Sequence, residues 1–255
     1  MSLIILKIGG SVITDKGSIS RAREAEIGRI SHEIAAFRND SDSRLILIHG
    51  AGSFGHPQAM KYRLNEGFDV QGVYLTHLSV KLLNSRVVES LNNAGVHSLP
   101  VHPLSSCLLD NGKLVDFQLG QIKAMLEKDI VPVLHGDVVM DITRGASVLS
   151  GDRIVHYLAL LLKASKIGAG SDVDGVLGEE ETVIRKITHF SFMDLKRNIK
   201  GSGCTDITGG MNGKVSELLE LAGKGIDSRI FNASRKGMVS RFLYGEDVGT
   251  LISDK

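Results

Sequence analysis

Residues 3–11 read LIILKIGGS, an apolar run that contains one lysine, Lys7, and stops at two glycines. A short apolar run bounded by glycine is typical of a strand buried on both faces. Residues 45–52, LILIHGAG, repeat the pattern, and residues 21–37 between the two runs carry apolar side chains at helical spacing. This order of strand, glycines, helix, strand and glycines is typical of an α/β fold.

The alternation continues to the end of the chain. The spacing predicts helices over 73–93, 119–128, 154–163, 211–223 and 238–242, with a further helix near 192–198 in a polar stretch. It predicts strands over 96–101, 130–134, 164–169 and 228–232, a last edge strand over 249–253, and two hairpins, one turning at Asn111-Gly112 and one over 138–148. We therefore expect a three-layer αβα sandwich with an open, mostly parallel central sheet. The chain, 1–255, would be one domain whose two lobes, about 1–162 and about 163–255, share that sheet.

Composition excludes several classes of protein. The 255 residues are 42% hydrophobic and 23% charged with a net charge of +1, which argues against disorder and against a broad nucleic-acid surface. The two cysteines, Cys107 and Cys204, form no CxxC pair and suit neither a disulfide scaffold nor a thiolate metal site. No apolar run approaches the ~18 residues of a membrane span, and no signal peptide is recognisable, so we expect a cytoplasmic protein without a membrane partner.

Glycines follow both of the first strands, as Gly9-Gly10-Ser11 and as residues 50–53, GAGS. Backbone without side chains lets amide groups approach phosphate oxygens, and ligands of open α/β sheets bind beyond the carboxyl ends of the strands. Two such loops at neighbouring strand ends indicate one phosphate-rich site. Neither loop has the P-loop or the GxGxxG spacing, and each alone is also compatible with a tight turn.

Three lysines stand near these glycines or near a third glycine group. Lys7 ends the first strand and Lys16 follows in the next loop, while Lys214 follows TGG, residues 208–210, early in a helix. A lysine in a buried strand is costly unless it has a partner, so an anionic ligand is one interpretation and a solvated rim position is the other.

Carboxylates and histidines complete the candidate residues. Asp152 stands at an expected helix start, where N-capping is the simplest role, and Asp172 and Asp174 follow a strand in what reads as a turn. His56 lies just past the second glycine loop, where its ring suits a phosphate or phosphonate. His49 and His135 precede glycines at strand ends and are expected to be structural. No spacing builds a zinc site, so we expect no metal held directly by side chains.

The ordered motifs KIGGS (7–11), GAGSFGH (50–56), HGD (135–137), SGD (150–152), SDVDG (171–175) and TGGMNGK (208–214) resemble the amino acid kinase superfamily. The likeness extends over residues 4–252. Within that superfamily the chain looks most like the archaeal isopentenyl phosphate kinases, and the sharpest sign is His56 in SFGHP together with Lys16. Relatives that share the histidine include fosfomycin kinases.

The resemblance implies ATP-dependent phosphorylation of isopentenyl phosphate to isopentenyl diphosphate, with Mg²⁺ carried on the ATP phosphates and on water. It implies that residues from all six motifs take part. The catalytic set is Lys7, Lys16, His56, Asp152 and Lys214; the ATP-binding set is Lys7, Ile8, Gly9, Gly10, Ser11, Gly52, Asp172, Asp174, Gly210 and Lys214; and the acceptor phosphate is held by Ala51, His56 and Gly136. The isoprenoid tail would lie against the apolar face of the helix over 73–91, and the chain would form a homodimer through its first lobe.

Some residues depart from the family pattern, and other functions stay open. Ala51 stands where a third glycine is usual, which requires an ordinary φ there, and Ser171 replaces a threonine. Gly168 and Gly170 are expected to weaken their strand. The alternatives are a fosfomycin-type phosphonate kinase, a carboxylate, carbamate or nucleotide kinase of this fold, and a non-catalytic nucleotide-binding protein.

Overall fold

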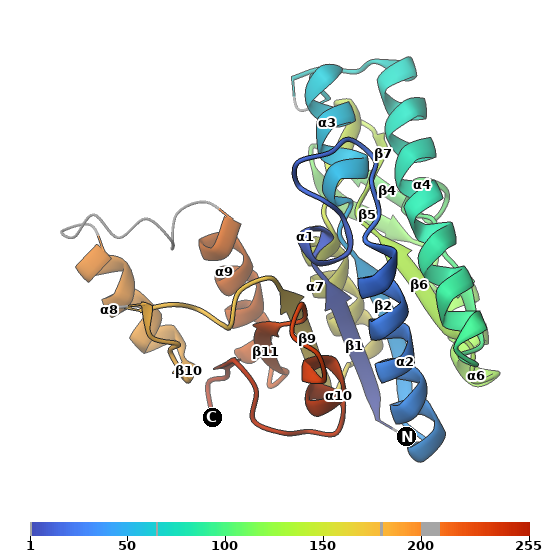
Figure 1. The fold of residues 1–255 in the computed structure, drawn as a ribbon. Coiled ribbons are helices and arrows are strands. Elements are labelled where there is room, and N and C mark those ends of the chain that lie inside the picture. Colours follow the sequence, from blue (N-terminus) through green and yellow to red (C-terminus); the bar gives the residue numbers. More distant parts are fainter. Residues whose placement is uncertain (1, 65, 179–180, 200–209) are drawn as a thin grey trace.

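An eight-stranded sheet runs through the whole molecule (Figure 1). The computed structural model describes residues 2–64, 66–178, 181–199 and 210–255. In spatial order the strands are β10 (Lys186–Ile187), β12 (Thr250–Ile252), β11 (Asp227–Asn232), β9 (Lys166–Ser171), β1 (Leu3–Ile8), β2 (Arg44–His49), β6 (Val131–His135) and β3 (Ser98–Pro100). Neighbouring strands are parallel except β11 and β12, so the prediction of an open, mostly parallel sheet is confirmed.

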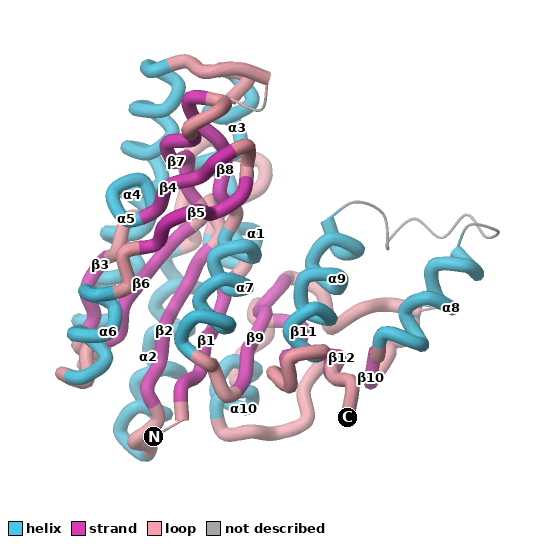
Figure 2. The backbone as a smooth tube through the Cα atoms, turned by 180° about the vertical axis from the view of Figure 1, so that it is seen from behind, coloured by secondary structure: helices cyan, strands magenta, loops and turns pink. Residues whose placement is uncertain are grey.

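Helices cover both faces of this sheet (Figures 1 and 2). One face packs against α2 (Glu24–Asp40), α4 (Val70–Asn93) and α10 (Met238–Leu243), and the other against α6 (Gly120–Glu127), α7 (Gly151–Leu162) and α9 (Gly210–Ala222). The alternation of a strand explains the division, because Ile4, Leu6 and Ile8 point to the α2 side while Ile5 points to the α7 side. The three-layer prediction is confirmed. The lobe boundary near residue 162 stays a prediction.

A second, four-stranded sheet stands beside the first, in the order β5 (Lys113–Phe117), β4 (Cys107–Asp110), β7 (Asp137–Asp141) and β8 (Gly145–Leu149). The predicted Asn-Gly turn is present, with φ of 47° at Asn111 and 76° at Gly112. The buried Asp141 carboxylate joins the two hairpins by accepting hydrogen bonds from the N–H groups of Asn111 and Gly112 and from its own turn. Sequence analysis predicted both hairpins but not the sheet that they form together.

One prediction about the C-terminal strands was wrong. The last strand, β12, is not at the edge, because β10 pairs on its outer side. The strand that contains Gly168 and Gly170, β9, pairs along its length with both β1 and β11; that its glycines weaken it stays a prediction. A Cβ on Gly168 would lie 2.4 Å from the Phe242 ring, and one on Gly170 would lie 2.8 Å from Ala233. Because these two residues have no side chain, α10 and the turn after β11 can pack closely against β9.

Several short elements were missed by sequence analysis: α1 (Gly10–Ile13), α3 (Gly52–Lys61), α5 (Pro103–Ser106) and β10, while the helix expected near 192–198 is the longer α8 (His189–Ile199). The missed helix α3 contains Gly52, Gly55 and Pro57, which all argue against a helix. A Cβ on Gly55 would lie 3.2 Å from Val80, so glycine lets α3 lie close to α4. None of the described helices is long and apolar enough to cross a membrane.

Pro57 also explains how the loop that carries Lys16 is attached. Proline has no N–H, so the carbonyl of Ser53, four residues earlier in α3, lacks its helical partner. The N–H of Ser20 donates to that carbonyl instead, at 3.1 Å. The loop between α1 and α2 is thereby tied to α3, the helix that bears His56.

Candidate active site

A cavity of about 620 Å³ opens at the carboxyl ends of the central strands. All six predicted motifs contribute residues to the lining of this cavity, and the motif over 208–214 contributes Lys214. The lining includes Lys7, Gly9, Gly10, Ser11, Lys16, Ala51, Gly52, His56, Gly136, Asp152, Asp172 and Lys214. Such an edge is where ligands bind in open α/β sheets. The structure thus brings together residues that are up to about two hundred positions apart in the chain.

The two glycine loops touch each other at the floor of this cavity. A Cβ on Gly10 would lie 2.4 Å from the nitrogen of Gly52, and one on Gly50 would lie 2.5 Å from the nitrogen of Gly10. No side chain fits between these backbones, which is why both loops are rich in glycine. Ala51 has φ −71°, so the ordinary backbone conformation that an alanine requires is present.

Lys7 and Asp152 form a largely buried ion pair on the α7 side of the sheet. Nζ of Lys7 lies 2.9 Å from Oδ1 and 3.1 Å from Oδ2 of Asp152. Burial opposes ionisation of this carboxyl, but the charges of Lys7 and Lys214 and the hydrogen bond from Lys7 outweigh it and hold its pKa below the usual range. Burial and the charge of Lys7 lower the pKa of Lys214. Asp152 is therefore not the helix N-cap; that role belongs to Ser150, which accepts from Arg153.

Lys16 forms the second lysine–carboxylate pair, with Nζ 2.6 Å from Oδ2 of Asp172. Partial burial opposes ionisation of Asp172, and hydrogen bonds from Lys16 and Ser11 overcome it, so its pKa is lowered. The Lys16 side chain is exposed and stands on the loop that Ser20 ties to α3. An approaching phosphate would find this ammonium group on the open side of the cavity.

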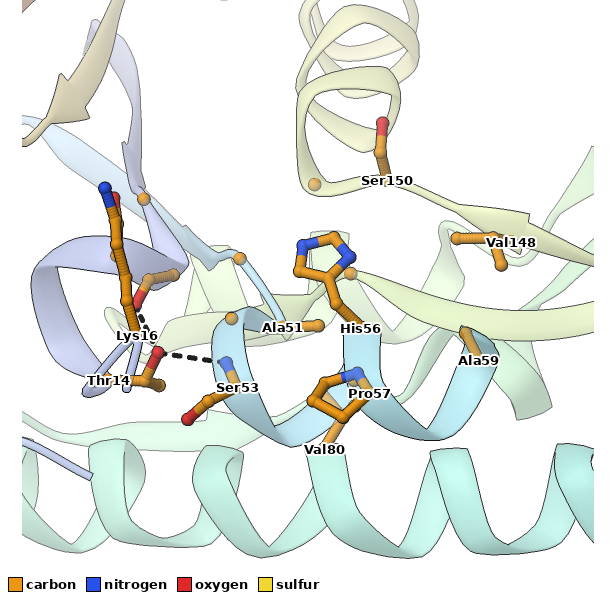
Figure 3. Close-up of a pocket in the computed structure, with 18 of the residues that line it drawn as sticks. Thr14, Lys16, Ala51, Ser53, His56, Pro57, Ala59, Val80, Val148 and Ser150 are labelled. Atoms are coloured by element: carbon orange, nitrogen blue, oxygen red, sulfur yellow. Dashed lines mark hydrogen bonds between the residues drawn. The ribbon is translucent and has the colours of Figure 1, made fainter. Parts of the chain in front are cut away.

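His56 divides the cavity into a charged part and an apolar part. Figure 3 shows its ring rising from α3 toward the segment that bears Ser150, with Ala51 on one side and Val148 on the other. Ala59 and Val148 lie on the side of His56 away from Lys16, and Val80 lies beside Pro57 (Figure 3). These apolar side chains line the cavity, as do the buried residues Thr76 and Asp137. The predicted apolar face of α4 contributes Val80 to this lining, but Leu83 and Val87 pack into the core beside α2.

Two backbone amides lie near Gly136, because a Cβ on Gly136 would lie 3.2 Å from the nitrogen of Gly151 and 3.6 Å from that of Ala51. Within the described part of the chain, the N–H groups of Ala51 and Gly151 have no acceptor. Gly151 is the first residue of α7, a twelve-residue helix, and helix N-termini favour anions. The N–H of Gly136 donates to the carbonyl of His49 at 2.9 Å, so the backbone donor that the predicted role of Gly136 requires already has an acceptor.

Comparison with known proteins places this geometry in a family. The profile of the amino acid kinase family matches residues 2–232. Isopentenyl phosphate kinases of Methanothermobacter thermautotrophicus and Haloferax volcanii are each 38% identical to the chain; the matches cover 99% of this chain and 100% and 99% of those proteins. A crystal structure of an isopentenyl phosphate kinase superposes with a TM-score of 0.85 at 34% identity, over 98% of this chain and all of that one.

The chain belongs to the isopentenyl phosphate kinase family, within the amino acid kinase family. It is therefore a phosphotransferase, and the resemblance that its motifs carry is confirmed.

Within the described part of the chain, two residues predicted to bind ATP, Ile8 and Asp174, do not line the cavity. The side chain of Ile8 is buried in the core, and Asp174 accepts hydrogen bonds from Asn232 and Arg235. Gly210 begins α9, while Thr208 and Gly209 of the same motif lie outside the described residues. Any contact of these residues with ATP stays a prediction.

Two residues of the isopentenyl phosphate kinase site, Thr14 and Gly151, were not predicted from the sequence. Thr14 accepts from the N–H of Ser53 at 3.1 Å and donates to the carbonyl of Gly10 at 2.7 Å, which joins the two glycine loops (Figure 3). No local pattern marks it, because its partner is 39 positions away. Gly151 was detectable, since a serine followed by glycine and aspartate before an apolar helix indicates a capped N-terminus with free amides.

Proposed function

We propose that the chain phosphorylates isopentenyl phosphate with ATP, giving isopentenyl diphosphate and ADP. The observation that carries the proposal is the position of His56, between the lysine-rich part of the cavity and a part lined by Ala59, Val80 and Val148. A phosphate bearing a short hydrocarbon tail matches both parts. The isopentenyl phosphate kinases compared above match nearly the whole chain.

In the proposed reaction an oxygen of the acceptor phosphate forms a bond to the γ-phosphorus of ATP. The bond from that phosphorus to the β,γ-bridging oxygen breaks, and ADP leaves with the electron pair. The acceptor oxygen is already an anion, so positioning and charge compensation are the main requirements. His56 and the N–H groups of Ala51 and Gly151 would hold the acceptor phosphate, and Lys16 would leave Asp172 to meet the transferring group.

The nucleotide phosphates would lie over Gly9, Gly10, Ser11 and Gly52, with Lys7 and Lys214 beside them, held in place by Asp152. We propose that Mg²⁺ accompanies ATP on its phosphates and water. The donor set fits this, because the carboxylates of Asp152 and Asp172 already face lysines, and the described residues contain no group of three metal-ligating side chains. The ion would add charge neutralisation when bound.

A test is ATP consumption with four acceptors side by side: isopentenyl phosphate, fosfomycin, carbamate and UMP. We expect isopentenyl phosphate to have the highest kcat/KM, because only its tail fills the apolar part of the cavity. Preference for fosfomycin would support the phosphonate kinase alternative. Absence of turnover with all four would contradict the proposed reaction.

We also propose that the chain forms a homodimer, and that it works in the cytoplasm where ATP is supplied. Helix α4 carries an exposed apolar stripe of Val70, Tyr74, Leu78 and Leu82, spaced by four residues and so on one face. Contiguous exposed apolar patches mark association surfaces. Light scattering should give twice the chain mass, and Tyr74→Glu with Leu78→Glu should give the monomer.

A further inference from the structure

The side chains of two buried histidines lie side by side at the strand ends that lead into the cavity loops, and they have no role in the site described so far. His49 ends β2 and His135 ends β6, and the two residues are register partners in the parallel pair. Their rings stack with centroids 5.6 Å apart, and the exposed fractions of the residues are 1% and 0%. Each ring nitrogen Nδ1 lies close to the carbonyl oxygen of the glycine that follows, at 3.0 Å for His49 and 3.1 Å for His135.

Asn84 of α4 decides which nitrogen of His49 carries the proton. The amide nitrogen of Asn84 lies 3.3 Å from the carbonyl oxygen of Val133 and 3.1 Å from Nε2 of His49. The carbonyl accepts only, so the side chain of Asn84 must present its NH₂ group here. That group has two hydrogens and two neighbours, and the second hydrogen goes to Nε2 of His49. Nε2 is therefore the acceptor.

A neutral imidazole that accepts at Nε2 carries its proton on Nδ1. Burial and the neighbouring His135 lower the pKa of His49 to about 3, so the ring is neutral at physiological pH. The Nδ1–H of His49 consequently donates to the carbonyl of Gly50. Asn84 is fully buried, and among the described residues its Oδ1 has no hydrogen-bond partner. Leaving this oxygen unpaired costs free energy, which the NH₂ group offsets by binding the histidine.

The orientation of one carbonyl decides the orientation of the next N–H. A peptide unit is planar, and in the trans form its C=O and N–H point in opposite directions. The described residues contain no cis peptide bond. Because His49 holds the carbonyl of Gly50 down toward the core, the N–H of Ala51 in the same peptide unit points the other way. Ala51 lines the cavity, and its N–H has no acceptor within the described residues.

We propose that His49 is a positioning residue, whose Nδ1–H holds the Gly50–Ala51 peptide so that the Ala51 amide faces the acceptor phosphate. Asn84 supports it by selecting the tautomer. The backbone carbonyl of His49 also accepts from the N–H of Gly136, so the same residue anchors the neighbouring loop. The inference rests on the proposed function in that it assigns the acceptor phosphate to this end of the cavity.

Two substitutions separate the hydrogen bond from the bulk of the ring. His49→Asn places an amide nitrogen where Nδ1 stands and keeps a donor for Gly50. His49→Gln places its amide group where Nε2 stands, and so keeps a partner for Asn84 but loses the donor to Gly50. Both remove the ring, so a purely structural role predicts similar kinetics and similar melting temperatures for the two variants.

We expect His49→Gln to raise KM for isopentenyl phosphate by about 10-fold, and His49→Asn to stay within about 3-fold of wild type, as loss of one hydrogen bond to a charged group predicts. KM for ATP should change less in both. Asn84→Leu, which removes the selection of the tautomer, should fall between them. Equal acceptor KM values in the two His49 variants at equal folded fractions would overturn the proposal.

A binding measurement tests the role of His49 independently of which substrate the chain phosphorylates. The amide resonance of Ala51, in ¹⁵N-alanine-labelled protein and assigned with Ala51→Ser, should shift on addition of inorganic phosphate in wild type and in His49→Asn but much less in His49→Gln. Wild type that shows the shift without turning over isopentenyl phosphate would overturn the proposed function alone. Equal shifts in both variants would overturn the role of His49.

Discussion

Two lysine–carboxylate pairs face the same cavity and differ mainly in the exposure of the lysine to water. The Lys7 side chain is 7% exposed and the Lys16 side chain is 71% exposed, while the side chains of Asp152 and Asp172 are 31% and 32% exposed. Lys7 projects from the central strand β1, and Asp152 projects from the first turn of α7. Lys16, by contrast, stands on the loop between α1 and α2, which hydrogen bonds at Thr14 and Ser20 tie to Ser53 of α3.

The difference in exposure separates a fixed part of the site from a movable one. Removing one partner of a buried pair strands the other charge in a medium of low polarity, so Lys7 and Asp152 keep each other in place. An exposed pair contributes about 0–1 kcal/mol, so Lys16 leaves Asp172 at little cost. We infer that the Lys7–Asp152 pair is a fixed part of the site against which the ATP phosphates bind. Lys16 of the second pair moves with the transferred phosphoryl group and compensates its charge.

The largest effect is expected from Lys16→Ala. If Lys16 compensates charge mainly in the transition state, kcat should fall by about 10²–10³-fold while KM for ATP changes little. The free energy of unfolding should stay within about 1 kcal/mol of wild type, because the lost pair is exposed. Steady-state kinetics and urea melts measure both, with Lys123→Ala on α6 as a surface control. A near-normal kcat would remove Lys16 from the mechanism.

Asp152→Asn removes the charge of the carboxylate in the buried pair and should lower the stability of the folded chain. It keeps the shape of the side chain but leaves Lys7 and Lys214 without their carboxylate, which predicts a loss of about 3 kcal/mol in the free energy of unfolding. The matched variant Asp172→Asn should lose no more than about 1 kcal/mol. Urea denaturation of both variants compares them directly. Equal losses would show that burial does not distinguish the two pairs.

His56 extends the comparison of the two lysines. Its side chain is exposed like that of Lys16, but its ring has no hydrogen-bond partner among the described residues. His56→Ala should lower kcat/KM for isopentenyl phosphate by roughly 10- to 150-fold, the value of a hydrogen bond to a charged group. His56→Gln, which keeps an N–H donor of similar reach, should retain more activity, and KM for ATP should change little in either. If His56→Ala keeps the wild-type value, the substrate assignment loses its main support.

The smallest expected effect is a dependence of stability on pH. The pKa of Asp152 is lower in the folded chain than in the unfolded chain, where it is about 3.9. Its contribution to stability is therefore complete above the unfolded pKa and is lost as pH falls through the folded pKa. The difference in unfolding free energy between wild type and Asp152→Asn should be constant near neutrality and shrink below about pH 4. Urea midpoints across this range check it; a difference that grows in acid would contradict the ion pair.

The elements that could be predicted from the sequence are those whose signals are local. The apolar runs that became β1 and β2, the long helix α4 and the turn at Asn111-Gly112 all carry their pattern within a few residues. Helix α3 was missed because two glycines and a proline oppose it locally, and only its packing on α4 makes it a helix. Strand β10 has two residues, too few for any periodicity.

The candidate site divides in the same way. The identity of the chemical groups was readable from the chain, since glycines at strand ends, three lysines and one histidine carry the family resemblance. Their pairing was not readable, because Lys7 meets Asp152 across 145 positions and Lys16 meets Asp172 across 156. The same holds for Gly136, whose N–H turned out to have an acceptor in His49, a residue of another strand.

The sequence by itself determined the α/β architecture, the family and the groups available for phosphoryl transfer, because short-range periodicity and motif order carry that information. Only the tertiary structure decided which lysine is buried and which is exposed, and which backbone N–H groups remain free. Burial and hydrogen-bond partnership depend on what packs against a group from distant parts of the chain. The strength of a charge or a donor is set by those neighbours rather than by its own residue type.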